Sequence, residues 1–379
     1  MSARIWLLLG AAALAGCSGD GKVREPTELQ DIVSPQIKPA AAWTASAGKG
    51  SGKYYGALQP VVEADAVFAA DVEGRVYAFD PRDGSRIWQA DTGALVISGP
   101  TVSGNAVLVG TMDGEVIALK RADGAPYWRS TVSSEALAPP VSDGTLVIAR
   151  AGDGRTHALS AVSGAPVWVF DRSVPNLTLR GLGRPVIAGS LAFLGTDNGR
   201  VAAVRMADGQ PLWEQLIAAP AGRNELERLN DVDGDLLLVD DDLFAASFGG
   251  EVVRIDGETG QVLWRRPAVK SYNGVARAGS LIIVTDEAGV VWGLDAETGA
   301  AAWRNEDLKY RRLSAPGVFA DTVVVGDYEG YLHWLDPRDG RLIGRTRAGS
   351  DPIRAAPTPG EGVLYTLNTA GRLAAIKLK

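Results

Sequence analysis

A glycine recurs eight times at intervals of 39 to 51 residues, and this period constrains the fold more than any other feature of the sequence. A second glycine follows ten residues later in the first seven copies, and in six of these a tryptophan follows four residues after that. The first glycines of the copies are Gly74, Gly114, Gly154, Gly199, Gly250, Gly289, Gly330 and Gly371. Such a period is typical of propellers and solenoids, in which each repeat is one small unit packed against its neighbours.

Alternating apolar segments separated by turn residues fill each copy, as the first copy illustrates. Residues 58–62, 67–70 and 76–79 are mostly apolar, Gly74 lies in a turn, and Trp88 lies on a fourth segment. Glycine at such turns supplies the positive φ that hairpins require. Four short antiparallel strands in about 40 residues form one blade of a β-propeller.

The eighth copy has two recognisable strands, residues 363–367 and 372–378, but no tryptophan strand of its own. Trp43 has a suitable strand around it and no blade before it, so we expect it to supply the outer strand of the last blade. This closure would remove a free sheet edge. We therefore predict an all-β, eight-bladed β-propeller of four-stranded antiparallel blades over residues 41–379; an open solenoid is the alternative. The tryptophans expected to cover the seams between blades are Trp43, Trp88, Trp128, Trp168, Trp213, Trp264 and Trp303.

The N-terminus has the features of an export signal. Arg4 precedes an apolar run at 5–14, which is too short to cross a bilayer as a helix. The sequence Leu14-Ala-Gly-Cys17 then matches the bacterial lipobox. We predict a lipoprotein signal peptide at 1–16, lipidation of Cys17, and a flexible tether at 17–40; a plain secretory signal is the alternative. Cys17 is the only cysteine, which excludes an intramolecular disulfide.

No constellation of residues typical of catalysis stands out. His157 and His333 occupy the same repeat position, which elsewhere holds residues such as Tyr and Val, so we interpret it as a packing position. The segment Asp231-Val-Asp233-Gly-Asp235 begins like a calcium loop but lacks the glycine required at the sixth place. A net charge of −7 gives no broad basic surface for nucleic acid. We expect no catalytic residue, metal or cofactor.

The repeat is interrupted most strongly after Trp168 and Trp213, where two long connections at 171–184 and 216–235 leave adjacent blades. Because they leave equivalent strands, they should emerge side by side on one face, and insertions in repeats often form the binding face. Their candidate contact residues for a protein partner are Leu177, Leu179, Arg180, Asp231 and Asp233. A second interpretation is that Arg180 pairs with Asp231 or Asp233 and braces the two connections.

The copies resemble the tryptophan-docking repeats of quinoprotein propellers, for example in residues 289–303. The whole chain resembles the BamB family, the lipoprotein B subunits of the outer-membrane β-barrel assembly machinery. Three stretches carry the closer resemblance: Leu177–Gly181, Glu227–Asp233 and Gly326–Trp334. Quinone-dependent dehydrogenases, by family resemblance, have adjacent cysteines near the cofactor, which this chain lacks.

The BamB resemblance implies a monomeric, non-enzymatic scaffold that is lipid-anchored in the outer membrane and faces the periplasm. It implies that Leu177, Leu179, Arg180, Asp231 and Asp233 dock the periplasmic domains of the BamA subunit, and that unfolded barrel precursors are weaker partners. Ser18, following the cysteine, fits transfer to the outer membrane. The alternatives are a PQQ-type quinoprotein enzyme and a periplasmic interaction module with a different partner.

Overall fold

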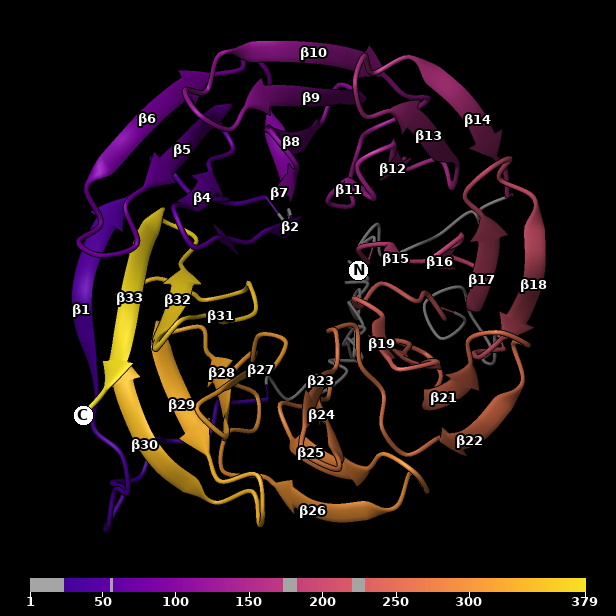
Figure 1. The fold of residues 1–379 in the computed structure, drawn as a ribbon. Coiled ribbons are helices and arrows are strands. Elements are labelled where there is room, and N and C mark those ends of the chain that lie inside the picture. Colours follow the sequence, from indigo (N-terminus) through magenta and orange to yellow (C-terminus); the bar gives the residue numbers. More distant parts are fainter. Residues whose placement is uncertain (1–23, 55–56, 173–182, 220–228) are drawn as a thin grey trace, which may run out of the picture.

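A computed structural model describes residues 24–54, 57–172, 183–219 and 229–379. Over these residues the strands form eight sheets that follow one another around a ring, which confirms the eight-bladed propeller (Figure 1). Seven sheets have four strands and one has five. No helix among the described residues is long and apolar enough to cross a membrane.

The blades are numbered here from the first complete copy, and their strands are given from the centre outward. Blade 1 contains β3 (Val61–Val62), β4 (Val67–Ala70), β5 (Arg75–Phe79) and β6 (Arg86–Asp91); blade 2 contains β7 (Val96–Ser103), β8 (Ala106–Thr111), β9 (Glu115–Lys120) and β10 (Pro126–Thr131). Blade 3 contains β11 (Val141–Ser142), β12 (Leu146–Arg150), β13 (Thr156–Ser160) and β14 (Pro166–Phe170); blade 4 contains β15 (Val186–Ala188), β16 (Leu191–Gly195), β17 (Arg200–Arg205) and β18 (Pro211–Leu216).

The second half of the ring repeats this order. Blade 5 contains β19 (Leu237–Val239), β20 (Asp242–Ala246), β21 (Val252–Asp256) and β22 (Val262–Arg266); blade 6 contains β23 (Ala276–Ala278), β24 (Leu281–Thr285), β25 (Val291–Asp295) and β26 (Ala301–Asn305). Blade 7 contains β27 (Gly317–Phe319), β28 (Thr322–Gly326), β29 (Tyr331–Leu335) and β30 (Leu342–Arg347); blade 8 contains β31 (Thr358–Gly360), β32 (Val363–Leu367), β33 (Arg372–Leu378) and β1 (Pro39–Ser46).

The turn between the second and third strands explains the first glycine of the repeat. At Gly74 the backbone has a φ of 94°, a region that side chains with a Cβ disfavour. A polar side chain three residues earlier closes this turn: Asp71 Oδ1 accepts the backbone N–H of Arg75 at 2.9 Å. The same bond recurs in six other blades, where a backbone N–H donates to the side chain four residues earlier. The donor and acceptor pairs are Glu115 and Thr111, Arg200 and Thr196, Glu251 and Ser247, Val290 and Asp286, Tyr331 and Asp327, and Arg372 and Asn368.

The second glycine receives the tryptophan of the preceding blade. The Trp88 indole N–H donates to Arg121 O at 2.9 Å, and a Cβ added at Gly124 would lie 2.7 Å from the Trp88 ring. Each of the seven tryptophans makes such a bond, at 2.7 to 3.0 Å, to a carbonyl in the last turn of the next blade. The acceptors are Pro81, Arg121, Ala161, Met206, Gly257, Ala296 and Pro337. Each tryptophan therefore ties its own blade to the next one.

The ring is closed by the N-terminal strand, and the open solenoid is excluded. β1 pairs antiparallel with β33 from Pro39↔Leu378 to Ser46↔Arg372, so the first and last strands of the described chain share blade 8 (Figure 1). Because of this, blade 8 has no turn between its third and fourth strands on which a tryptophan of blade 7 could dock. At the corresponding position blade 7 has Gly344, and Ile37 occupies the space: a Cβ on Gly344 would lie 2.6 Å from Ile37 Cγ1.

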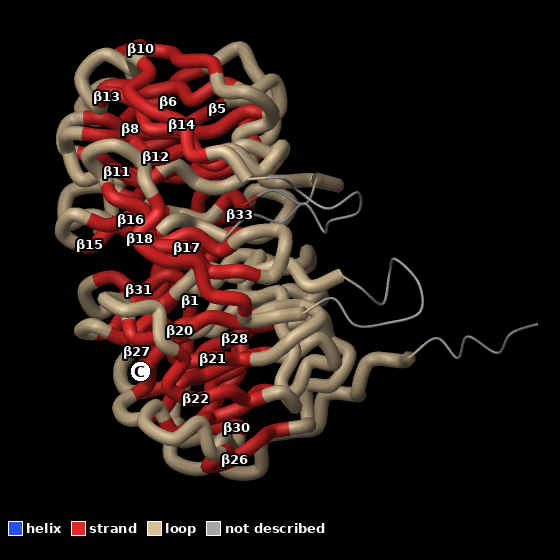
Figure 2. The backbone as a smooth tube through the Cα atoms, turned by 90° about the vertical axis from the view of Figure 1, so that its right-hand side faces the viewer, coloured by secondary structure: helices blue, strands red, loops and turns tan. Residues whose placement is uncertain are grey.

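The two faces of the ring differ in what they carry. One face, called here the loop face, carries the turn between the second and third strands of every blade and the connection from each outer strand to the next blade. Figure 2 shows the ring edge-on, with the strands between two layers of loops. Towards the centre, β2 (Ala57–Leu58) adds in parallel to β7, and the nearby Gln59 accepts a hydrogen bond from Arg184 Nη2 at 3.3 Å.

Candidate partner-docking site

The two long connections lie on the loop face because they join β14 to β15 and β18 to β19. Leu177, Leu179 and Arg180 fall outside the residues that the structure describes. Asp231 and Asp233 are described, as are the bases of both connections.

The returning part of the second connection is packed into the ring. Val232 and Leu236 are part of the hydrophobic core between blades 4 and 5, and Leu229 is also buried. The Val232 backbone N–H donates to Thr196 O at 3.2 Å, and the Phe248 N–H donates to Asp231 O at 3.1 Å. These bonds join the segment to the turn between the second and third strands of blades 4 and 5, so its backbone position is fixed.

Asp231 and Asp233 lie beneath the surface. The Asp231 side chain is fully buried, and both carboxylate oxygens of Asp233 are inaccessible to solvent. Neither Asp233 oxygen has a hydrogen-bond partner among the described residues. Burying a carboxylate without such partners disfavours its charged form.

The surroundings of Asp233 strengthen this effect. Burial, followed by the neighbouring charges of Asp231 and Asp197, raises the pKa of Asp233 well above its ordinary value, and Arg150 opposes the shift. Burial likewise raises the pKa of Asp197, again against the influence of Arg150. Arg150 is itself buried, which lowers its pKa. One buried guanidinium therefore faces several acidic groups beneath the two connections.

Arg150 and Asp197 were not found by sequence reasoning, although the repeat contains a signal for Arg150. Arg150 lies four residues before the first glycine of its copy. That position is occupied elsewhere by Ala70, Gly110, Gly195, Ala246, Thr285, Gly326 and Leu367. A long cation in a column of mostly small residues marks a local structure that the other blades lack.

The bases of the two connections are held together by charge and close backbone packing. Arg150 Nη1 donates to Gly183 O at 3.2 Å, and the Arg184 backbone N–H donates to Asp235 Oδ1 at 2.7 Å. The Arg184 and Asp235 side chains approach to 4.0 Å. Gly183 also lies so close to Gly234 O that a Cβ would clash. Bracing between the connections thus exists through Arg184 and Asp235; whether Arg180 adds to it lies outside the described residues.

Both histidines serve the blades. His157 Nε2 lies 2.8 Å from Ser133 Oγ, and His333 Nε2 lies 2.9 Å from Asp327 Oδ2. Burial lowers the pKa of both imidazoles. At the same repeat position Trp292 Nε1 donates to Asp286 Oδ2 at 2.9 Å. This agrees with a structural position, and the described residues contain no group of three side chains suited to hold a metal ion.

Comparisons with known proteins agree on one family. A family model described as "Outer membrane protein assembly factor BamB" matches residues 72–305 and 287–379. The chain is 45% identical over 374 residues to the outer membrane protein assembly factor BamB of Pseudomonas aeruginosa, covering 98% of each chain. It is 34% identical over 369 residues to the protein of that name from Escherichia coli K12, covering 94% of each chain.

Solved structures show the same fold in BamB and in enzymes. The crystal structure of BamB from Moraxella catarrhalis matches with a TM-score of 0.82 and 27% identity, covering 89% of this chain and 99% of that one. A europium-containing methanol dehydrogenase matches with a TM-score of 0.72 and 15% identity, covering 86% of this chain and 84% of that one. At that identity the likeness to the dehydrogenase is one of fold alone.

Proposed function

Because the chain belongs to the BamB family of outer membrane protein assembly factors, we propose that its loop face docks the periplasmic domains of BamA. The protein is a non-enzymatic assembly factor of the Bam complex at the outer membrane. Within that role it acts as a scaffold that helps to deliver unfolded barrel precursors. The propeller itself acts as a monomer.

The observation that supports the proposal is that the described bases of the two long connections are joined to each other on the loop face. Their bases are joined by Arg184 and Asp235 and rest on the buried Arg150. A rigid base reduces the ordering cost that a partner must meet when it binds. We assign Leu177 and Leu179 to apolar contact with BamA and Arg180 to a forked hydrogen bond with a partner carboxylate.

Asp231 and Asp233 belong to the same site in a different way. Since both carboxyl groups are buried, they act from beneath the contact surface. A cationic side chain above them, whether it is Arg180 or a residue of the partner, would offset the effect of burial and favour the charged forms of Asp233 and Asp197. Docking and bracing are therefore compatible functions of these residues.

Cys17 is the proposed attachment point to the membrane. Cleavage after residue 16 and diacylation of Cys17 would hold the protein on the periplasmic side of the outer membrane without a spanning segment. Precursor strands are proposed to pair transiently with the exposed edges of outer strands. These strands carry exposed apolar side chains at Ile87, Tyr127, Val167, Leu212 and Leu263.

Co-purification with BamA tests the docking proposal. The double variant Leu179→Ala, Arg180→Ala should stay folded and lose co-purification from detergent-solubilised envelopes. The matched control is Val162→Ala, Arg205→Ala, which removes an exposed apolar side chain and an arginine that pairs only locally with Asp208. The control should co-purify with BamA as the wild type does. Undiminished co-purification of the Leu179/Arg180 variant would refute the proposed site.

A further inference from the structure

The N-terminal segment 24–38, called here the strap, is attached to blade 7. Sequence analysis placed it in a flexible tether. In the structure the Thr27 backbone N–H donates to Lys309 O at 3.0 Å, and the Gln36 N–H donates to Ile343 O at 2.9 Å. Ile37 packs against the hydrophobic core shared by blades 7 and 8. The strap therefore follows the outer strand β30 from one face of the ring to the other.

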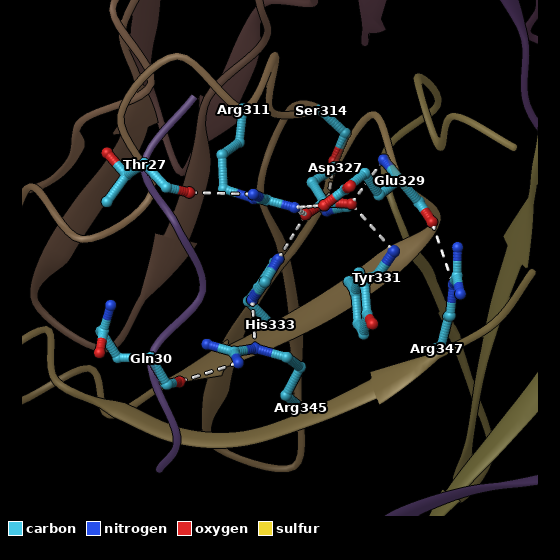
Figure 3. Close-up of polar contacts among 11 residues, drawn as sticks. Thr27, Gln30, Arg311, Ser314, Asp327, Glu329, Tyr331, His333, Arg345 and Arg347 are labelled. Atoms are coloured by element: carbon cyan, nitrogen blue, oxygen red, sulfur yellow. Dashed lines mark hydrogen bonds and ion pairs between the residues drawn. The ribbon is translucent and has the colours of Figure 1, made fainter. Parts of the chain in front are cut away.

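Two arginines hold the strap by its backbone: Arg345 lies in blade 7, and Arg311 lies in the connection that precedes this blade (Figure 3). Arg311 Nη1 donates to Thr27 O at 3.0 Å, and Arg345 Nη1 donates to Gln30 O at 3.0 Å. Arg311 is almost completely buried and donates through Nε to Asp327 Oδ2 at 2.9 Å. It also forms an ion pair with Glu329. We call Arg311, Asp327, His333 and Arg345 the clasp.

His333 links the two arginines through Asp327. In the equivalent pair of blade 6 a ring N–H donates to the aspartate, and the same arrangement in blade 7 gives His333 Nε2–H donating to Asp327 Oδ2. His333 Nδ1 is then the acceptor for Arg345 Nε, at 3.1 Å. One chain of hydrogen bonds thus runs from buried Asp327 through the imidazole to Arg345 and the strap (Figure 3).

Comparison among blades shows what is special about Arg345. The residue after the tryptophan position is also arginine in blades 2, 5 and 6. In blades 2 and 5 this arginine bonds to the preceding blade: Arg129 donates to Thr92 O and Arg265 donates to Leu216 O. Both acceptors lie at the end of the outer strand of the preceding blade. In blade 7 the corresponding arginine bonds to the strap instead. The stretch Gly326–Trp334, which lies outside the two long connections, supplies both Asp327 and His333 to the clasp.

We propose that the clasp sets the length and exit point of the leash between the membrane anchor and the propeller, and so turns the loop face towards the membrane. The proposal rests on the proposed lipidation of Cys17. Lys309 and Arg311 lie in the connection from β26 to β27, which is on the loop face, whereas Ile343 lies near the opposite face. The lipid-bearing end therefore leaves the propeller on the same face as the two long connections.

The clasp also shortens the reach of the anchor. From Cys17 to Thr27 the chain has ten residue steps and can span at most about 35 Å. Without the clasp the first fixed residue would be Pro39 in β1, and the span would rise to about 75 Å. The effective concentration of the propeller at the membrane falls with about the 3/2 power of leash length. Release of the strap from the clasp should therefore lower this concentration about threefold. Release would also remove the orientation of the loop face.

Hydrogen exchange of the full mature protein in vesicles measures the clasp directly. In wild type the amides of Thr27, Gln36 and Ile37 should be protected. Arg345→Gln combined with Thr27→Pro should accelerate exchange across residues 28–37 by about tenfold or more, because one charge-assisted bond and one backbone bond are lost. The matched control Arg304→Gln alters the equivalent residue of blade 6, which pairs locally with Glu306. It should leave the strap protected.

Energy transfer to acceptor headgroups measures the leash. Donor dyes are placed on Leu95→Cys, on the loop face, or on Val162→Cys, on the opposite face; both native side chains are exposed. Transfer should be greater from position 95 than from position 162, and the strap variant should reduce this difference. Equal transfer from the two positions in wild type, or an unchanged difference after release of the strap, would overturn the proposal. Mass spectrometry separates the two claims: an unmodified Cys17 would overturn the anchor and with it the leash, whereas acylated Cys17 with unprotected strap amides would overturn the clasp alone.

Discussion

Replacement of Trp43 by alanine tests the closure of the ring. The Trp43 indole N–H donates to Pro81 O at 3.0 Å, and its ring packs against Gly84 and against Tyr365, with ring centroids 5.7 Å apart. Removing a fully buried tryptophan costs about 3–5 kcal/mol, and Trp43 is half-buried. Pro81 O keeps a donor, because the Tyr365 hydroxyl also reaches it at 3.3 Å. We expect a loss of about 2–3 kcal/mol in the free energy of unfolding.

The control is Trp213→Ala, whose side chain makes the equivalent contacts at another seam. Trp213 donates to Gly257 O at 3.0 Å and is also half-buried, so the global loss measured by urea unfolding should be similar. The two variants should differ locally. β18 is joined to β17 by a short turn, whereas no turn joins β1 to β33. Hydrogen exchange at residues 372–378 should therefore accelerate in Trp43→Ala and remain slow in Trp213→Ala.

Equal exchange at residues 372–378 in the two variants would refute the reasoning. It would mean that the pairing of β1 with β33 holds the ring closed without the tryptophan seam. A much larger loss of unfolding free energy in Trp213→Ala than in Trp43→Ala would also refute the reasoning, because the two seams are expected to contribute equally to stability. Unfolding midpoint and slope should both be recorded, because a changed slope would indicate a change in surface exposed.

Three further predictions concern the seams and the docking site. Gly124→Ala should destabilise the protein by more than 1 kcal/mol in urea unfolding, because φ is 72° and the new Cβ would lie 2.7 Å from the Trp88 ring; Gly144→Ala, at a φ of 91° with no atom near, isolates the backbone contribution. Asp233→Asn should raise the free energy of unfolding at pH 7 and lose this advantage as the pH falls towards 4. The pKa of Asp233 is higher in the folded than in the unfolded protein, so the native state binds more protons between the two pKa values. The wild type is therefore destabilised relative to the Asn variant as the pH rises through this range. No pH dependence in the difference between Asn and Asp would contradict this assignment. Asp235→Ala should weaken co-purification with BamA while leaving the melting temperature nearly unchanged, because it removes both the acceptor of the Arg184 backbone N–H and the ion-pair partner of the Arg184 side chain at the base of the connections; unaltered co-purification would show that the brace is dispensable.

The regular part of the fold was predictable because its turns and its blade contacts each require one residue type, glycine or tryptophan. At seven of the eight seams a tryptophan packs on a glycine with a positive φ, so the spacing of these two residue types predicts the blades. The absence of a tryptophan at Gly344 was also visible, and it pointed to closure by Trp43. That Ile37 fills the vacant place was not predictable, since the strap has no periodicity of its own.

The site was less predictable, for a physical reason. A long insertion suggests a surface loop, yet residues 229–236 return into the core through Val232 and Leu236. This return carries Asp231 and Asp233 below the surface, so acidic residues that suggested a solvent-facing contact are buried. Whether a charged residue in a loop faces water depends on the neighbouring blades, which one segment of sequence does not describe.

The two interruptions of the repeat are related by the ring itself. The braced bases of the two connections belong to blades 3 to 5, and the N-terminal end of the strap lies beside blade 7, so they lie on opposite sides of the ring on the loop face. Seven similar tryptophan seams and one closed by Ile37 make the ring a stiff spacer between them. A stiff spacer transmits the position of the anchor to the docking residues, which a flexible linker would not do. On the proposed function, the regular blades fix the separation between the membrane leash and the BamA contact.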